Sequence, residues 1–332
     1  MWTLLVAVPF VLSLMNATFA AAQEASANQK SLPEQSVDAF AKVFGVHPQA
    51  RVNHAKGVIV EGTFTPSAAA ASVSKAAHLH KHKDPIPVTV RFSEGSGVPT
   101  VPDTEKMFRG MAVKYALPDG SKTDIVALSY NGFPVATAEE FRDFLLAIAA
   151  SGPDAPKPTA LDKFLSAHPA AKTFVESATQ PPVSFATVAY FGINSFKFTN
   201  AKGAVTYGRY QIQPEAGSKS LTAEELAKAG PDYLVDEINE RIRHGPAKFK
   251  LLLQIAEQGD KIEDPSIAWP DSRKLVELGT IAITKSTTES HTADKQLFLP
   301  GAVVPGIEAA DPMIGVRSLA YPISFVRRLK PQ

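Results

Sequence analysis

Residues 311–322 read Asp311-Pro-Met-Ile-Gly-Val-Arg-Ser-Leu-Ala-Tyr-Pro322. If this segment is helical, Arg317 and Tyr321 lie on the same face, because residues four apart are neighbours on a helix. A guanidinium held against a phenol favours the ionised phenolate, and a phenolate is an anionic oxygen ligand suited to ferric iron. The alternative is a helical tyrosine with an ordinary polar neighbour, and this pair alone does not decide between the two.

A second informative segment lies far upstream, at residues 51–57. With it, the chain carries five blocks in a fixed order: Arg51-Val-Asn-His-Ala-Lys-Gly57, Val88-Thr-Val-Arg-Phe-Ser93, Arg109-Gly-Met-Ala-Val-Lys-Tyr115, Asn131-Gly-Phe-Pro134, and Pro305-Gly-Ile-Glu-Ala-Ala-Asp-Pro-Met313 leading to Arg317 and Tyr321. Together the blocks resemble the haem catalase family, and most closely its short, catalase-related peroxidases. The resemblance runs from about Val43 to about Arg328.

This resemblance implies an α+β fold, in which an eight-stranded antiparallel β-barrel has surrounding helices and haem is buried between barrel and helices. The residues agree with the expectation, since strand-like and helical runs are mixed without a regular β-α-β alternation. We therefore expect a single catalase-core haem domain over residues 36–332.

The resemblance also assigns the residues on the two faces of the haem. Tyr321 would be the proximal ligand of the iron, kept anionic by Arg317. His54 would be the distal base, held by Ser93, because a histidine can take a proton from peroxide and return it near neutral pH. Asn131 would donate a hydrogen bond that polarises the peroxide. For a lone histidine the commoner role is a surface or core residue, and the surrounding block favours the functional interpretation.

Three further residues match positions that contact the cofactor in the family. Arg51 and Arg91 would bind the haem propionates, because the planar guanidinium pairs well with carboxylates. Phe144 would stack on the distal face, although it also belongs to an apolar helix stripe typical of plain core. Similarly, Asn131 followed by Gly132 is a strong turn signal. The cofactor is expected to be haem b, since attachment through cysteine is impossible in a chain with no cysteine.

Departures from the family pattern suggest which reaction dominates. Gly95 stands where full catalases have a channel valine, Ala136 and Thr137 replace a phenylalanine pair, and Met107 replaces an acidic residue. We hypothesise a wider route to the haem, so that a small organic reductant reaches an oxo-ferryl intermediate and peroxidase turnover exceeds catalase turnover. The alternatives are true catalase action, rearrangement of a fatty-acid hydroperoxide, and a haem-binding protein without turnover.

The N-terminus resembles an export signal. Residues 1–22 combine an apolar run from Trp2 to Met15 with the small residues Ala20 to Ala22, which predicts cleavage near Ala22. An uncleaved anchor is the alternative, but the run is short for a membrane span. Residues 23–35 are polar and are predicted to be a linker. The protein is thus expected in the periplasm or outside the cell, without membrane contact after cleavage.

Composition and charge restrict the partners. A net charge of +1 without a basic stripe argues against a nucleic-acid binder. The expected partners are hydrogen peroxide and a small organic reductant. Since the interlocking arm of catalase tetramers is missing, we expect a monomer or homodimer. His78, His80 and His82 would share one side of a strand and form a metal site, but neighbouring lysines favour a solvated loop.

Hydrophobic periodicity locates the elements. Helices are predicted at 36–46, 138–150, 160–177, 223–229, from 231 to about 243, and at 313–328 with a break at Pro322. Strands are predicted at 57–64, 88–92, 111–117, 124–128, 184–191, 195–199, 204–212, 249–255 and 276–284.

Overall fold

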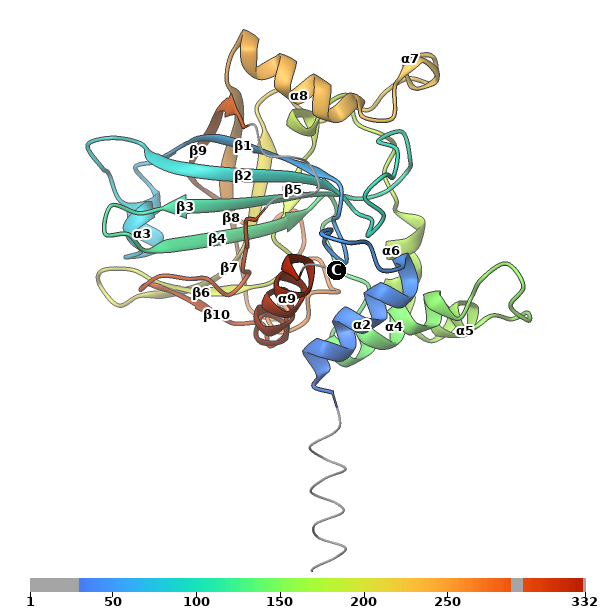
Figure 1. Ribbon diagram of the computed structural model, residues 1–332. Helices are drawn as coiled ribbons and strands as arrows, with labels where there is room; N and C mark the ends of the chain where they lie inside the picture. The colour runs from blue at the N-terminus through green and yellow to red at the C-terminus, as the bar shows by residue number, and fades with distance from the viewer. Residues whose placement is uncertain (1–29, 288–294, 331–332) are drawn as a thin grey trace, which may run out of the picture.

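A computed structural model describes residues 30–287 and 295–330 (Figure 1). The strands are β1 (Gly57–Pro66), β2 (Ile86–Glu94), β3 (Arg109–Ala116), β4 (Lys122–Leu128), β5 (Tyr190–Phe191), β6 (Phe196–Thr199), β7 (Val205–Pro214), β8 (Ala247–Ile255), β9 (Leu275–Ser286) and β10 (Ile307–Ala309). The helices are α2 (Leu32–Phe44), α3 (Ala70–Val73), α4 (Ala138–Ala149), α5 (Ala160–Ala167), α6 (Pro169–Glu176), α7 (Ala223–Lys228), α8 (Tyr233–His244) and α9 (Met313–Leu329), with short 3₁₀ turns η1 (Ala77–Leu79) and η2 (Phe185–Thr187).

Eight of the strands form a closed antiparallel barrel. Neighbouring strands pair in the order β1-β2-β3-β4-β5-β7-β8-β9, and β9 pairs back onto β1. β6 and β10 extend the sheet beside β7. The expected eight-stranded antiparallel barrel with surrounding helices is therefore confirmed.

Alternation along β2 separates the barrel core from the outer face. Val90 and Phe92 belong to the core cluster, whereas Arg91 and Ser93 line a cavity outside it. Successive side chains of a strand point to opposite faces, so one short strand supplies both the packing of the barrel and part of the candidate site.

Most of the helices lie on two sides of the barrel (Figure 1). The group of α2, α4, α5 and α6 stands at one side, and α9 packs against α2 beside the sheet. α7 and α8 lie across another side of the barrel. The space between the barrel, α2 and α9 is where the candidate site is found.

Most predicted elements are present, with instructive differences at their boundaries. α2 begins at Leu32, within the predicted linker, because the Ser31 amide donates to Glu34 Oε2 at 2.9 Å and starts the helix earlier. The single helix predicted at 160–177 is two helices, since Pro169 starts α6 with a new axis. The strand predicted at 184–191 is η2 followed by the two residues of β5.

The predicted break at Pro322 is wrong, because α9 continues through the proline to Leu329. A proline inside a helix removes one hydrogen bond. Buried residues at both ends of α9, Met313, Ile314 and Arg328, hold the two halves in one helix. The predicted export signal at residues 1–22 lies outside the described residues, and no described helix is long and apolar enough to cross a membrane.

Candidate active site

Two adjoining cavities, of about 150 and 340 Å³, lie where α2, α9 and the barrel meet. His54 and Tyr321, which are 267 positions apart in the sequence (321 minus 54), line both of them. Arg51, Arg91 and Ser93 line the smaller cavity. The structure therefore brings Tyr321 together with four of the other residues expected from the sequence, which are His54, Ser93, Arg51 and Arg91.

The proximal side is a chain of hydrogen bonds that ends at Tyr321. Arg317 Nη2 donates to Tyr321 Oη at 2.6 Å, and Arg317 Nη1 donates to Asn194 Oδ1 at 2.5 Å. Asn194 Nδ2 in turn donates to Asp311 Oδ2 at 2.6 Å. Burial raises the pKa of Asp311, while the Asn194 hydrogen bond opposes this shift. Asn194 thus holds one nitrogen of the Arg317 guanidinium, Nη1, while the other, Nη2, donates to the phenol oxygen of Tyr321.

Sequence reasoning missed Asn194 and Asp311. Asp311 opens the segment quoted first, and its Oδ1 accepts from the Met313 amide at 2.9 Å at the start of α9. Asn194 lies 117 positions before Asp311 in the sequence, and no local pattern indicates that the two side chains meet.

The distal side is built around a strained backbone at His54. This residue has φ +54°, in the left-handed region that non-glycine residues rarely adopt. Its Nδ1 lies 3.0 Å from Ser93 Oγ, as the family resemblance implied. A Cβ atom at Gly110 would lie 2.9 Å from the imidazole ring and 2.7 Å from Ser93 Oγ. Gly110 is therefore needed to leave room for the imidazole, a role that its sequence position did not reveal.

The electrostatic surroundings keep His54 neutral. Burial, the largest cause, lowers the pKa of His54 to about 3. The positive charges of Arg91, Arg51 and Arg317 act in the same direction, whereas a hydrogen bond with the main chain of Glu94 opposes them. A neutral imidazole is the form that can accept a proton, so His54 is in the basic form at neutral pH.

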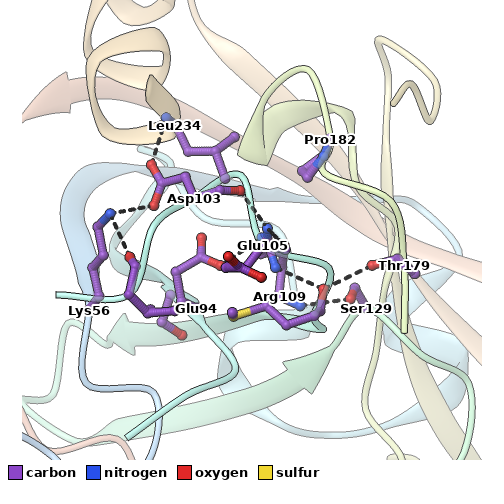
Figure 2. Close-up of polar contacts among 12 residues, drawn as sticks. Lys56, Glu94, Asp103, Glu105, Arg109, Ser129, Thr179, Pro182 and Leu234 are labelled. Carbon is purple, nitrogen blue, oxygen red and sulfur yellow. Dashed lines mark hydrogen bonds and ion pairs between the residues drawn. The ribbon is translucent and has the colours of Figure 1, made fainter. Parts of the chain in front are cut away.

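A network of buried polar side chains supports the distal loop (Figure 2). Lys56 Nζ lies 2.7 Å from Asp103 Oδ1 and 2.8 Å from Asp232 Oδ1, and it donates to the Pro231 carbonyl at 2.6 Å. Asp103 Oδ2 accepts from the Leu234 amide at 2.9 Å, near the start of α8. The loop that carries His54 is thereby tied to a helix on another side of the barrel.

Arg109 is the centre of the neighbouring part of this network (Figure 2). Its Nε pairs with Glu94 Oε2 at 2.8 Å, and its guanidinium donates to the carbonyl oxygens of Asp103, Glu105 and Met107 at 2.8 to 2.9 Å. The Arg109 amide donates to Ser129 Oγ at 2.8 Å. Since Glu94 follows Ser93 in the chain, this network also fixes the strand end that holds the His54 ring.

The remaining predicted residues are placed as follows. Arg51 and Arg91 line the smaller cavity, and each donates to a carbonyl, of Gln296 at 2.7 Å and Ala55 at 3.1 Å respectively. Phe144 lines the larger cavity. Asn131 is half-buried but is not among the described residues that line either cavity.

The three histidines of residues 78–82 do not form the strand that a shared metal site required. His78 lies in η1 and is buried beside Phe64 and Tyr115. His80 and His82 contact the carbonyl oxygens of Ser74 and Ala77. Within residues 30–287 and 295–330, no cluster of three or more metal-ligating side chains of His, Asp or Glu is present. The expectation of a solvated loop is wrong for His78, whose surroundings are apolar.

Comparison with known proteins supplies the family. The sequence model of the catalase family matches residues 40–332. This chain belongs to the catalase family. Membership makes it an oxidoreductase that acts on peroxide and implies a haem cofactor.

Individual family members differ in length. A catalase-related peroxidase of Mycolicibacterium paratuberculosis is 38% identical, over 89% of this chain and 94% of that protein. A catalase-related peroxidase of Synechococcus elongatus is 31% identical, over 90% and 89% respectively. The solved structure of a fungal catalase superimposes with a TM-score of 0.74 at 23% identity, over 85% of this chain but only 60% of that catalase. The chain therefore has the family fold at the size of the short members.

The residues present fit a haem group. Tyr321 offers a phenol oxygen that already accepts a hydrogen bond from Arg317, and His54 lines the same two cavities. Arginines line the smaller cavity, as propionates require, and the walls of the larger one are mainly apolar and aromatic. Tyr321 would hold the iron, and Arg51 and Arg91 would hold the propionates.

Proposed function

We propose that this protein is a haem peroxidase that reduces hydrogen peroxide or an organic peroxide with electrons from a small organic donor, and has weak or no catalase activity. The observation that carries the proposal is that a neutral His54 and the Tyr321 phenol, to which Arg317 donates a hydrogen bond, line the same two cavities. A protein that only binds haem needs neither a neutral distal histidine nor the Ser93 hydroxyl that holds it.

The lining of the larger cavity supports an organic donor. Phenylalanine rings contribute much of it, from Phe108, Phe133, Phe141 and Phe174 among others, and Phe108 and Phe174 stand 4.5 Å apart between ring centroids. Among the described residues that line it there is no Asp, Glu or Lys. Val175, which is 41% exposed, brings the lining to the surface. A neutral apolar molecule loses less hydration on entering such a route than a charged one.

The sequence departures contribute less than expected to this route. Gly95 lines the larger cavity, but a Cβ atom there would lie 2.6 Å from the Phe108 carbonyl oxygen, so the glycine is required by the close approach of two chain segments. Met107, Ala136 and Thr137 are not among the described lining residues of either cavity. The proposed preference for organic donors therefore rests on the apolar lining.

Each residue has a defined task in the proposed reaction. His54 takes a proton from one peroxide oxygen and returns it to the leaving oxygen, and Ser93 keeps the imidazole in place. Bound haem supplies the redox chemistry. Arg317, held by Asn194, donates a hydrogen bond to the Tyr321 oxygen and places a positive charge beside it.

The test begins with the visible spectrum of haem-supplied protein beside a Tyr321→Phe variant. We expect a high-spin ferric phenolate spectrum that the variant loses or alters. Oxygen release and oxidation of a phenolic donor are then measured at equal peroxide concentration, with His54→Ala as the catalytic control. Donor oxidation far below oxygen release would establish catalase action instead, and unchanged peroxide reactivity in His54→Ala would point to a haem binder.

We also propose haem b as the cofactor, export to the periplasm or beyond the cell, and a monomeric or homodimeric state. The absence of cysteine from the sequence supports non-covalent haem. The apolar run and alanines of residues 1–22 support export. Mass determination of the protein recovered from its native host, with size-exclusion chromatography, tests the last two proposals.

A further inference from the structure

Asn53, the residue immediately before His54, is a polar side chain that the roles above do not use. It lines both cavities, as do His54 and Tyr321. Its amide oxygen, Oδ1, is buried and has no hydrogen-bond partner among the residues that the structure describes. A buried acceptor without a partner is costly, so natural proteins rarely keep one without a reason.

The loop that carries Asn53 is constrained on its C-terminal side. His54, the next residue, has a left-handed backbone with φ +54°. The Ala55 amide donates to the Ser96 carbonyl at 2.8 Å, and Lys56 is locked to Asp103 and Asp232. Because the loop is constrained, Asn53 Oδ1 cannot move to a hydrogen-bond donor of the protein. A molecule in the cavity is therefore its expected partner.

The chemistry of hydrogen peroxide matches this pair of groups. Hydrogen peroxide carries two O–H groups, and both the neutral His54 imidazole and Asn53 Oδ1 can accept a hydrogen bond. An alkyl hydroperoxide carries only one O–H group. If that proton goes to His54, the Asn53 oxygen stays unpartnered.

We propose that Asn53 is a catalytic and specificity-determining residue, whose amide oxygen accepts a hydrogen bond from the second O–H group of hydrogen peroxide and so favours this substrate over alkyl hydroperoxides. The inference rests on the proposed peroxidase function. It also assigns a distal amide at residue 53, in addition to the amide that the family resemblance placed at Asn131, which does not line these cavities.

The test uses Asn53→Leu, which keeps approximately the size of the side chain and removes its polar atoms. Rates of reaction of the haem-loaded enzyme are measured with hydrogen peroxide and with tert-butyl hydroperoxide. The loss of one hydrogen bond should slow the hydrogen peroxide reaction about tenfold, with little change for the alkyl hydroperoxide. Asn239→Leu is the matched control, because Asn239 Oδ1 is also buried without a hydrogen-bond partner among the described residues but lines neither cavity, and this variant should leave both rates unchanged.

Thermal unfolding of haem-free and haem-loaded protein supplies a readout independent of activity. Removing an unpartnered buried oxygen should leave the melting temperature of Asn53→Leu unchanged or raise it, whereas a structural amide would lower it. Asn53→Asp, which keeps an acceptor oxygen, serves if the leucine variant does not fold and should retain the preference for hydrogen peroxide.

The outcomes separate this inference from the proposed function. Equal slowing with both peroxides, unchanged rates with both, or a lower melting temperature in Asn53→Leu would overturn the role of Asn53 while leaving a peroxidase. If Asn53→Leu does not fold and Asn53→Asp loses the preference for hydrogen peroxide, the role is also rejected. A wild-type enzyme that reacts with neither peroxide would overturn the proposed function itself.

Discussion

Arg109 and Glu94 form an ion pair inside the barrel, with 2.8 Å between Nε and Oε2 and about 1% of each side chain exposed. Both side chains lie on the barrel side of strands whose other face lines the active-site cavity, and Glu94 directly follows Ser93. A carboxyl and a guanidinium are thus buried immediately behind the residues that position His54. Such a pair is costly to desolvate, so its protonation affects stability.

The first prediction concerns the side-chain carboxyl of Glu94. Burial raises the pKa of Glu94 from 4.5 to about 8, against the opposing charge of Arg109. A carboxyl with a raised native pKa contributes stability that is present below pH 4.5 and is lost as pH rises through 8. Glu94→Gln removes this titration, so the wild type should lose stability relative to the variant over that interval.

Urea unfolding of both proteins at pH 5 and pH 8 measures this difference. Asp260→Asn serves as the control, because it weakens a different ion pair, with Arg273 at 2.9 Å, outside both cavities. A stability difference between wild type and Glu94→Gln that does not change with pH would show that Glu94 does not titrate there.

The second prediction concerns the pH dependence of the peroxide step. Because burial and nearby arginines lower the pKa of His54 to about 3, the imidazole stays neutral across the ordinary working range. The rate of reaction with peroxide should be flat from pH 7 down to about pH 4 and fall below it. His54→Ala should slow the step by roughly 10²- to 10⁴-fold, the usual contribution of a general acid-base.

Stopped-flow mixing with peroxide over this pH range provides the measurement. A midpoint near 6.5 in the wild type, absent from His54→Ala, would mean that His54 is exposed to water when haem is bound.

The third prediction concerns Gly110. A methyl group there would lie 2.9 Å from the His54 ring and displace it from Ser93. Gly110→Ala should therefore lower the rate with peroxide about tenfold or more and cost about 1–3 kcal/mol of stability, as overpacking does. Haem binding through Tyr321 should persist.

Gly230→Ala is the matched control, since a Cβ atom at Gly230 meets no atom within 4 Å. If Gly110→Ala reacted with peroxide at the wild-type rate, the position of the His54 ring against Ser93 would not matter for the reaction. The importance assigned to that contact would then be wrong.

The fourth prediction concerns the proximal chain. Asn194→Leu removes the link between Arg317 and Asp311, both of which lose a hydrogen bond at 2.5–2.6 Å. Leaving buried polar groups unpartnered costs about 1–3 kcal/mol, so unfolding should occur at lower denaturant concentration. The visible spectrum of the bound haem should also shift, because Arg317 would no longer be held against Tyr321.

Comparison with Asp311→Asn tests the far end of the chain, because that variant keeps the size of the side chain and one acceptor oxygen but loses the charge and one of the two hydrogen bonds that Asp311 accepts. A spectrum of Asn194→Leu identical to the wild type would show that Arg317 is held against Tyr321 without Asn194.

The sequence predicted contacts between residues that are close along the chain better than contacts between distant ones. Arg317 and Tyr321 are one helical turn apart, and their contact follows from the sequence alone. His54 and Ser93 were placed by family resemblance, because 39 positions separate them. Gly110 and Asn53 acquire roles only through what surrounds them, and nothing in their own sequence positions indicates an imidazole nearby or an unpartnered oxygen.

The same distinction explains the errors in secondary structure. Apolar periodicity continues across residues 160–177, but the proline at 169 divides the segment into two helices. At Pro322 the local rule predicted a break, and the packing of both halves of α9 prevented it. Local propensity is a weak prior where tertiary contacts oppose it.

The proposed iron ligand lies in α9, the last described helix, and the distal histidine lies before the first strand of the barrel. A chain emerging from the ribosome therefore displays His54 and Ser93 long before Tyr321 has been synthesised. The residue that would hold the iron is thus the last part of the candidate site to be made, and the two cavities are complete only when α9 lies beside the barrel.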